Sequence, residues 1–373
     1  MKLSDICDVY SGYAFKTFND LGQGIPVIKI SNLLTDGSID LINCLFTTEN
    51  IKEKFYSKKS DIYIALSGAT TGKISIMDKD DTFAINQRVG IVRNRSTIPN
   101  EYLKYFLMSK SNRILEEASG CAQPNISPKQ IANYDVPKCS GAEMNKIVSE
   151  LRKIDKIKNT YQKQLELLDE LVRARFVEMF GDPVDNPMNW KKKKLKDIVT
   201  EDCTISYGIV QTGEEQKEGV PVFRPVDIVN HTPKVEELKK TTEFISDRYK
   251  KTLLKGHELL ITVRANIADT FIADEEFMGC NVGRGIVPIR TQEDIMRLEF
   301  LKCLIDNKHL NDILKSKAKG ITLIQLNMED LRNVELIIPP IDLQIDYLKY
   351  SRLIDKSRLL RNHSLFLIKS IIL

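Results

Sequence analysis

Three short segments of the chain carry residue types that resemble catalytic motifs. The segment from Asp185 to Trp190 is similar to the Asn-Pro-Pro-aromatic loop of amino-methyltransferases, but methionine replaces the second proline and no glycine-rich cofactor loop precedes it. Asp227, followed by Glu237-Leu238-Lys239, has the side chains of a metal-dependent nuclease site, although 28% charged residues make such a set expected by chance. The segment from Ser67 to Lys73 lacks the spacing of a nucleotide-hydrolysing phosphate loop. We therefore predict a linker in the first case and no catalytic site in the other two.

The segment from Ser67 to Lys73 is better suited to contact DNA. Its small residues let backbone N–H groups approach a phosphate, its hydroxyl groups can donate hydrogen bonds, and its lysine supplies positive charge. A plain tight turn between strands is the alternative. The residues that we expect at DNA are Ser67, Gly68, Thr70, Thr71 and Lys73.

The second half of the chain has Thr262 to Asn266 at the equivalent place, with different chemistry. Arg264 and Asn266 stand there in place of glycines. Arginine and asparagine are the side chains best shaped for bidentate hydrogen bonds to the edges of guanine and adenine. We therefore expect each half of the chain to read a different base sequence.

Further polar segments are candidates for contact with a ligand. Residues 86–88 interrupt an apolar run and correspond to 281–284, and burying such polar groups without partners would be costly. The candidates there are Asn86, Gln87, Arg88, Asn281 and Arg284. Segments 120–127 and 319–327 form another pair, for which a structural turn is an equal alternative, and the loop 207–213 favours a structural role slightly. The candidates in these loops are Gln123, Asn125, Lys319, Gln325, Tyr207 and Gln211.

The chain repeats itself once, and this repeat must position the candidate residues. Four segments of the first half return in the same order in the second half: 2–6 as 194–198, 24–27 as 219–222, 90–92 as 285–287, and 154–156 as 354–356. Solenoid repeats have periods of roughly 20 to 50 residues, which are far shorter. The pattern therefore predicts a duplicated domain.

Each copy is predicted to be a mixed α/β (α+β) globule followed by a helix. Short apolar runs at 26–30, 62–66 and 82–85 are separated by turn residues, which is typical of strands. A helix is expected from Pro99 to Ala118, with Leu298 to Leu314 as its counterpart.

A long helix closes each copy. Residues 142–180 place apolar side chains at alternating steps of four and three, apart from Lys158, which predicts a coiled-coil seam. The seam residues are Ile147, Leu151, Ile154, Tyr161, Leu165, Leu168 and Val172. The second helix places Ile354, Leu365, Ile368 and Ile372 on one stripe, which Arg358 and Arg361 interrupt. We expect the two helices to pair antiparallel, with a globule at each end and an approximate two-fold relation.

Composition excludes several classes of protein. No apolar run approaches the roughly 18 residues that span a bilayer, and no leader follows Met1, so we expect a cytoplasmic protein without membrane contact. Seven cysteines without a C-x-x-C pair fit reduced thiols, and the four histidines lack metal-ligand spacing, so we predict no metal and no cofactor on this chain. The net charge of +4 requires any nucleic-acid surface to be local.

Together these segments resemble the specificity subunit of type I restriction-modification systems, over essentially the whole length. The segments that carry the resemblance follow the first helix, open the second globule, or lie in the polar loops. They are 176–183 with Asn186, Pro187 and Trp190, then 207–211, 264–266 and 123–127. Each segment alone is a weak indication of the family, but all of them occur together and in the expected order.

The resemblance implies a non-catalytic DNA reader. It implies target-recognition domains at 1–140 and 194–339, spacer helices at 141–181 and 340–373, and a linker at 182–193. Its partners would be double-stranded DNA with a split, asymmetric site, two methyltransferase subunits and, through them, restriction-translocase subunits. S-adenosylmethionine, ATP and Mg²⁺ would bind to those partner subunits.

One departure from the family and two alternatives remain. The second helix stops where the first copy continues into its linker, so we expect the family's C-terminal extension to be short or absent. The first alternative is a fused restriction or modification enzyme, which would need the catalytic motifs rejected above. The second is a coiled-coil scaffold without sequence-specific DNA binding.

Overall fold

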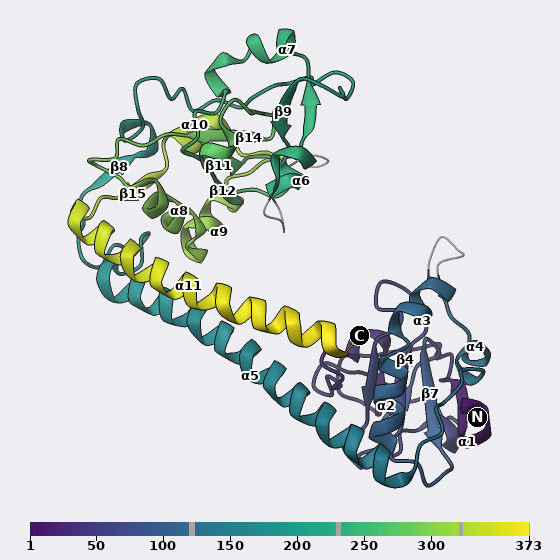
Figure 1. Ribbon diagram of the computed structural model, residues 1–373. Coiled ribbons are helices and arrows are strands. Elements are labelled where there is room, and N and C mark those ends of the chain that lie inside the picture. The colour runs from purple at the N-terminus through teal and green to yellow at the C-terminus, as the bar shows by residue number, and fades with distance from the viewer. Residues whose placement is uncertain (119–123, 229–232, 321–323, 373) are drawn as a thin grey trace. The chain divides into compact units, whose positions relative to one another are not determined.

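The computed structural model describes residues 1–118, 124–228, 233–320 and 324–372. The chain forms two compact units, one made of residues 1–163 with the segment from 362 onward, and the other of residues 164–361. Both units combine small sheets with short helices (Figure 1), which confirms the predicted mixed α/β class. The domain boundaries predicted from the sequence stay a prediction.

The first unit is built around a four-stranded antiparallel sheet of order β1-β7-β4-β5. Its strands are β1 (Cys7–Ser11), β4 (Ile62–Ala65), β5 (Ile74–Ile76) and β7 (Val89–Asn94). Successive side chains of a strand point to opposite faces. Ile62 and Ile64 of β4 therefore lie in one buried cluster with α2, whereas Tyr63 and Ala65 lie in another under the second sheet.

The second sheet of this unit has the order β3-β2-β6. Its strands are β2 (Ile25–Ile28), β3 (Leu45–Thr47) and β6 (Ala84–Ile85). The middle strand pairs antiparallel with β3 and parallel with β6. The three apolar runs that predict strands in the sequence thus correspond to β2, β4 and β6.

The second unit repeats this plan with a three-stranded main sheet and an additional two-stranded sheet. Its three sheets have the orders β12-β11-β14, β10-β9-β13 and β15-β8. The strands are β8 (Lys192–Lys194), β9 (Val220–Phe223), β10 (Lys239–Thr241), β11 (Glu258–Thr262), β12 (Thr270–Ala273), β13 (Asn281–Val282), β14 (Ile286–Ile289) and β15 (Glu335–Ile337). The central strand β11 again separates two cores, with Leu259 and Ile261 in one and Leu260 in the other.

Short helices cover the sheets in both units. They are α1 (Leu3–Ile6), α2 (Asn100–Met108), α3 (Ser111–Ala118), α4 (Pro128–Ala132), α6 (Pro225–Ile228), α7 (Glu243–Asp247), α8 (Leu298–Asp306), α9 (Lys308–Ser316) and α10 (Met328–Arg332). The 3₁₀ turns are η1 (Ile30–Asn32), η2 (Glu53–Phe55), η3 (Leu195–Asp197), η4 (Val235–Glu237), η5 (Lys250–Thr252) and η6 (Glu275–Phe277).

The single helix predicted at 99–118, and its counterpart at 298–314, are each two helices. In the second unit the break falls at Asn307, whose backbone is extended and whose side chain accepts hydrogen bonds from the N–H groups of His309 and Leu310, at 3.0 and 3.4 Å. Such capping begins a new helix. In the first unit the hydroxyls of Ser109 and Ser111 donate to the carbonyls of the preceding turn, both at 2.7 Å. Periodicity alone does not detect these local bonds.

The repeat extends to individual backbone bonds. The parallel pair Val27–Ala84 of the first unit recurs as Val222–Asn281 in the second. After β4, Leu66 N–H donates to the Arg88 carbonyl at 2.9 Å, and after β11, Val263 N–H donates to the Gly285 carbonyl at 2.8 Å. The Leu66 and Val263 carbonyls in turn accept from Ile126 and Leu326, each at 2.9 Å. The predicted duplication is therefore confirmed in the fold of each unit.

The first long helix, α5 (Gly141–Phe180), is continuous over 40 residues. Ser140 and Glu143 form a capping box at its start, with the Ser140 hydroxyl donating to the carboxylate at 2.8 Å. Met144 and Val148 are buried against the first unit, whereas Ile147 is 39% exposed. The predicted seam is therefore wrong at Ile147, because the first turns of the helix pack on the globule.

The second long helix, α11 (Ile341–Ile372), runs antiparallel to the end of α5 within the second unit. Tyr347 packs against Phe176 and Phe180, with ring centroids 5.5 and 5.6 Å apart. Further along, Arg361 Nε donates to Gln164 Oε1 at 3.1 Å. None of the helices in the described residues has the length and apolarity that crossing a bilayer requires.

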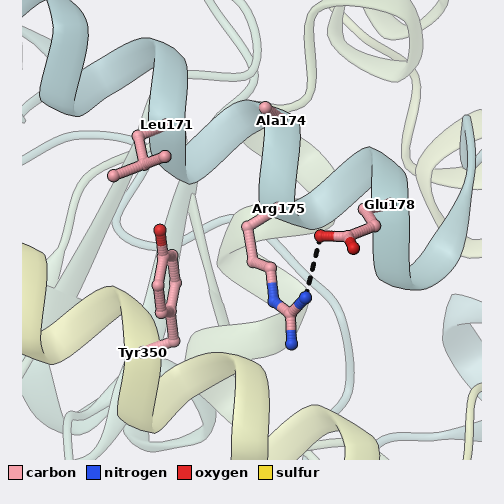
Figure 2. A pocket seen from close by; sticks show the side chains of 5 residues that line it. All are labelled: Leu171, Ala174, Arg175, Glu178 and Tyr350. Carbon is pink, nitrogen blue, oxygen red and sulfur yellow. Dashed lines mark hydrogen bonds and ion pairs between the residues drawn. The ribbon is translucent and has the colours of Figure 1, made fainter.

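The two arginines that interrupt the apolar stripe of α11 cross-link the helices. Arg358 forms ion pairs with Asp169 of α5 and with Asp355 of its own helix. A pocket on the same helix pair is shown in Figure 2. There Arg175 forms an ion pair of 2.8 Å with Glu178, and its guanidinium carbon lies 5.9 Å from the ring centroid of Tyr350. The side chains of the predicted stripe residues Leu365, Ile368 and Ile372 lie outside the described part of the structure.

The same ion pair anchors each long helix to its own globule. Arg152 of α5 forms an ion pair with Glu101 of α2, and Arg352 of α11 binds Glu299 of α8 at 2.6 Å. Each pair joins the first turn of a short helix to the long helix that follows it. Helix and globule are therefore joined in the same way in both copies.

Candidate nucleic-acid interface

The central strand of each unit ends in a tight turn that projects the first candidate residues. In the second unit the turn is closed by Thr262 N–H to the Asp269 carbonyl at 2.9 Å and by Ala268 N–H to the Thr262 carbonyl at 2.8 Å. Ala265 and Ala268 have φ of 60° and 61°, which is unfavourable for residues other than glycine. The first unit has Gly68 and Gly72 at these positions, with φ of 82° and 84°.

Arg264 stands at the start of this turn, between two neighbouring segments. It pairs with Gln325 in an isolated antiparallel bridge, while Val263 before it is bonded to Gly285. The Nε atom of Arg264 is buried without a hydrogen-bond partner among the described residues. Burial, followed by the nearby positive charge of Arg284, lowers the pKa of Arg264, and Tyr207 acts in the opposite direction. The structure therefore brings together Tyr207, Arg264, Arg284 and Gln325.

Other predicted residues of the second unit surround this cluster. Lys319 and Gln325 exchange two backbone hydrogen bonds of 2.9 Å and so form an antiparallel bridge. Gln211 and Asn266 are exposed, and the backbone carbonyl of Asn266 accepts from the Thr262 hydroxyl. Gly208 crosses β13 so closely that an added Cβ would lie 1.8 Å from the Val282 carbonyl oxygen. This contact requires glycine and fixes the path of the loop that carries Tyr207 and Gln211.

The first unit places its candidates in the same framework. Ser67 pairs with Asn125 as Arg264 pairs with Gln325, and Gly68 N–H donates to the Pro124 carbonyl at 3.1 Å. Gln87, Arg88 and Asn125 are exposed, whereas Ser67, Lys73 and Asn86 are partly buried. Gln123 lies outside the described residues.

The two threonines of this turn differ in role. The Thr71 hydroxyl donates to the Gly68 carbonyl at 2.6 Å and the residue is 6% exposed. The expectation that Thr71 contacts DNA is therefore wrong, because its hydroxyl closes the turn. The Thr70 Oγ1 atom is buried without a partner among the described residues, as is Arg264 Nε in the equivalent turn.

Asn281 is a second correction. It is fully buried, its amide donates to Ser246 Oγ at 3.0 Å, and its carbonyl oxygen accepts from Thr252 Oγ1 at 2.8 Å. Asn281 pairs with Val222 as Ala84 pairs with Val27, so Asn281 is the equivalent of Ala84 and lies inside the sheet. The polar group is thus satisfied internally and does not face a ligand.

The residue of the second unit that is equivalent to Asn86 is Gly283, two residues after Asn281. Asn86 N–H donates to the Ile28 carbonyl at 3.0 Å, and Gly283 N–H donates to the Phe223 carbonyl at 2.8 Å, in the same position of the sheet. Asn86 therefore matches Gly283, and Gln87 matches Arg284. The Asn86 side chain accepts from Arg88 N–H at 3.2 Å, so it also shapes its own turn.

A hollow beside Gln211 contains residues that the sequence does not single out. It is lined by Val210, Gln211, Gly213, Ile245, Arg248 and Tyr249. Phe244, on the same helix α7, is 75% exposed. Exposed aromatic and basic side chains are common in nucleic-acid contacts. The only sequence signal was the loop at 207–213, because exposure of α7 cannot be read from its composition.

The segments with catalytic resemblance are engaged in structural bonds. Asp227 binds Arg224 at 2.6 Å, and Lys239 binds Glu215 at 2.7 Å, so the nuclease-like set is not assembled. In the linker, the side chain of Asn186 accepts from Trp190 N–H and donates to the Trp190 carbonyl, both at 2.8 Å. The indole N–H of Trp190 donates to the Phe180 carbonyl at 3.0 Å, which fixes the end of α5.

Asp182, Asp185 and His309 have ligand atoms within 4.8 Å of one another. Asp182 Oδ1 already accepts from the N–H groups of Val184 and Asp185, at 2.8 and 3.1 Å, and lies 3.1 Å from His309 Nδ1. These backbone bonds and the contact with the imidazole lower the pKa of Asp182 against the opposing effect of burial, which is the largest single influence. The arrangement ties the turn after α5 to α9, and we interpret it as structural.

Comparison with known proteins shows to which family the chain belongs. A family model described as type I restriction modification DNA specificity domain matches residues 1–168 and 187–358. The chain is similar to the type I restriction enzyme EcoBI specificity subunit of Escherichia coli, with 21% identity over 92% of this chain and 76% of the relative. It is also similar to a putative type I restriction enzyme specificity subunit, MjaX, of Methanocaldococcus jannaschii, with 23% identity over 95% of this chain and 86% of the relative.

Solved structures show the same fold. The S subunit of a type I restriction-modification system from M. genitalium matches with a TM-score of 0.53 and 15% identity, covering 100% of this chain and 93% of that chain. A chain from a study of complex assembly and conformational transition of the type I R-M system matches with a TM-score of 0.59 and 18% identity, covering 100% and 94%.

Proposed function

We propose, from the premise that this chain belongs to the type I restriction-modification DNA specificity family, that it reads a split, asymmetric DNA sequence, one part with each unit. Family membership makes it a specificity subunit. The division of the target between the units, and the residues that contact it, are the proposal.

One observation carries this proposal. The two units share their strand pairs and the backbone bonds that hold the turns at Ser67 and Arg264, yet the side chains on these turns differ. A shared framework with different polar side chains suits two different base sequences, because direct readout depends on the donors and acceptors presented to base edges. The residues proposed to contact DNA are those predicted from the sequence, without Thr71 and Asn281.

Partner subunits are proposed to supply the chemistry. We expect two methyltransferase subunits to bind the chain, and restriction-translocase subunits to join through them. S-adenosylmethionine, ATP and Mg²⁺ would then bind to those subunits and not to this chain. Support comes from the relatives, which are named as specificity subunits of type I restriction enzymes, and from the assembly study of a similar chain.

The test compares the chain alone with the chain and its methyltransferase subunit. We expect no methyl transfer and no cleavage by the chain alone, and methylation of one bipartite sequence when both are present. The readout is methylation mapping of cellular DNA at single-molecule resolution. Methyl transfer by the lone chain would contradict the non-catalytic role, and binding to duplex DNA without any sequence preference would favour the scaffold alternative.

A further inference from the structure

Arg264, in the turn after β11, and Arg284, just before β14, lie close together, and neither forms an ion pair with a carboxylate among the described residues. Gly285, the residue after Arg284, approaches Arg264 so closely that an added Cβ would lie 3.4 Å from the Arg264 Cβ. Burial, followed by the charge of Arg284, lowers the pKa of Arg264. Three other arginines of the unit have acidic partners: Arg224 with Asp227 at 2.6 Å, Arg290 with Glu258 at 3.0 Å, and Arg297 with Glu293 at 3.1 Å. Like charges held together are unfavourable unless a ligand neutralises or accepts hydrogen bonds from them.

The surroundings of Arg264 restrict how it can bind. Its neighbours are held by backbone bonds on both sides, from Val263 to Gly285 and from Leu326 to Val263. Its Nε atom is buried, so the terminal nitrogens are the donors left for a ligand. A rigid guanidinium with two adjacent donors matches the O6 and N7 acceptors of guanine, which is the commonest specific contact in the major groove. Binding to a phosphate group of the DNA backbone does not require such a fixed orientation, because the positive charge alone attracts the phosphate.

The equivalent place in the first unit has different donors. Ser67 stands at the position of Arg264, since it pairs with Asn125 in the same bridge. Gln87 stands at the position of Arg284, one residue after the matched pair Asn86 and Gly283. Neither side chain carries a charge, and glutamine favours the N6 and N7 groups of adenine over guanine.

We propose that the half-site read by the second unit contains a guanine whose O6 and N7 accept hydrogen bonds from Arg264 and Arg284, whereas the first unit reads without an arginine at the matching positions. This inference rests on the proposed function and adds the base class that one unit selects. The segment that carries Tyr207 pairs with the segment that carries Arg284 through the bridge between Ile209 and Gly283, so Tyr207 lies near the same cluster.

The experiment uses the complex of the chain with its methyltransferase subunits and the target found by methylation mapping. Each guanine of the second half-site is replaced in turn by 7-deazaguanine, which lacks the N7 acceptor but still pairs with cytosine. At one position we expect binding to weaken by about fivefold to tenfold. The same replacement should cost nothing in whichever of the Arg264→Met and Arg284→Met complexes has lost the donor to N7, because methionine, unlike glutamine, has no N–H group.

A matched control separates loss of the contact from loss of charge. Lys194 is exposed on β8, in the separate sheet with β15, and Lys194→Gln removes one positive charge from the same unit. This variant should keep the full penalty for 7-deazaguanine. Trp190 fluorescence of the Arg264→Met and Arg284→Met variants should match the parent, so a folding defect cannot imitate the result.

Two other outcomes have separate meanings. If the complex binds a specific target but 7-deazaguanine is harmless at every guanine of that half-site, the inference is overturned and the proposed function stands. Uniform weakening of the arginine variants on all DNA, with a smaller dependence on salt, would likewise overturn it in favour of phosphate contacts. If the complex shows no sequence preference at all, the proposed function itself is wrong.

Discussion

Asn281 gives the sharpest test of whether a polar residue in an apolar run serves folding or recognition. Its amide donates to Ser246 Oγ and to the Tyr249 carbonyl at 3.0 and 3.3 Å, and its oxygen accepts from Thr252 Oγ1 at 2.8 Å. Ser246 and Thr252 are 4% and 3% exposed, so water does not reach these groups easily if the amide is removed. Asn281→Ala should therefore destabilise the second unit without changing the bases that it reads.

The magnitude follows from the groups left without partners. Each buried polar group that loses its hydrogen bond costs roughly 1–3 kcal/mol. Two hydroxyls, the Tyr249 carbonyl and the Val282 N–H are affected, but the Thr252 hydroxyl can keep its 3.0 Å bond to the Tyr249 carbonyl. We therefore expect a loss of about 3 kcal/mol in the free energy of unfolding. With a urea dependence of about 2 kcal/mol per molar, the unfolding midpoint should fall by roughly 1.5 M.

The chain offers a local probe for this measurement. Its one tryptophan, Trp190, belongs to the second unit and packs against the core that contains Phe176 and Phe180. Urea unfolding followed by Trp190 fluorescence therefore reports on that unit. Gln211→Ala is the matched control, because Gln211 is exposed, and its effect should stay within about 0.5 kcal/mol. A midpoint for Asn281→Ala equal to that of the parent, together with an altered recognition sequence, would refute the structural assignment.

Two further predictions concern the turns and the long helix. Gly68→Ala should destabilise the first unit and Ala265→Gly should stabilise the second, each by about 1 kcal/mol in thermal or urea unfolding, because a left-handed backbone costs residues other than glycine roughly 1–2 kcal/mol. The nearest atom to a Cβ added at Gly68 is 3.6 Å away, so the backbone conformation and not a steric clash should set the effect. Equal stability of both variants and the parent would contradict this prediction. Inserting one heptad after Gln164 should lengthen the unspecific gap of the mapped target by about three base pairs, because it adds roughly 10 Å of helix at ~1.5 Å per residue while keeping the seam on one face. If methylation mapping of an active variant returned the original gap, α5 would not be a spacer.

The fold could be predicted from the sequence where the signal was periodic or repeated. The duplicated segments located the equivalent turns, and the heptad pattern located α5 to within one residue of its start. The breaks within the two short helical regions, at Ser109 and Asn307, escaped because they depend on local side-chain bonds. Ile147 was misplaced because the seam pattern continues into turns that pack on the globule instead.

The candidate interface was predictable in position but not in register. Ser67 and Arg264 were matched correctly, since the runs that precede them are long and apolar. Asn281 was matched with Asn86 on residue type, although the strand pairs show that Asn281 corresponds to Ala84. A two-residue error of this kind keeps a side chain on the same face of a strand, so periodicity gives no warning. The hydrogen bonds that satisfy Asn281 come from α7 and η5, far away in the sequence.

The identical anchoring of the two long helices has a consequence for how such genes diversify. The Arg152–Glu101 and Arg352–Glu299 pairs join helix and globule in the same way, and the turns are held by main-chain atoms. A codon change at an exposed position such as Gln87 or Arg284 therefore leaves both cores intact. Because the exposed side chains are proposed to read DNA, a new recognition sequence would require no change in the main-chain bonds that hold the turns or in the ion pairs that join each helix to its globule.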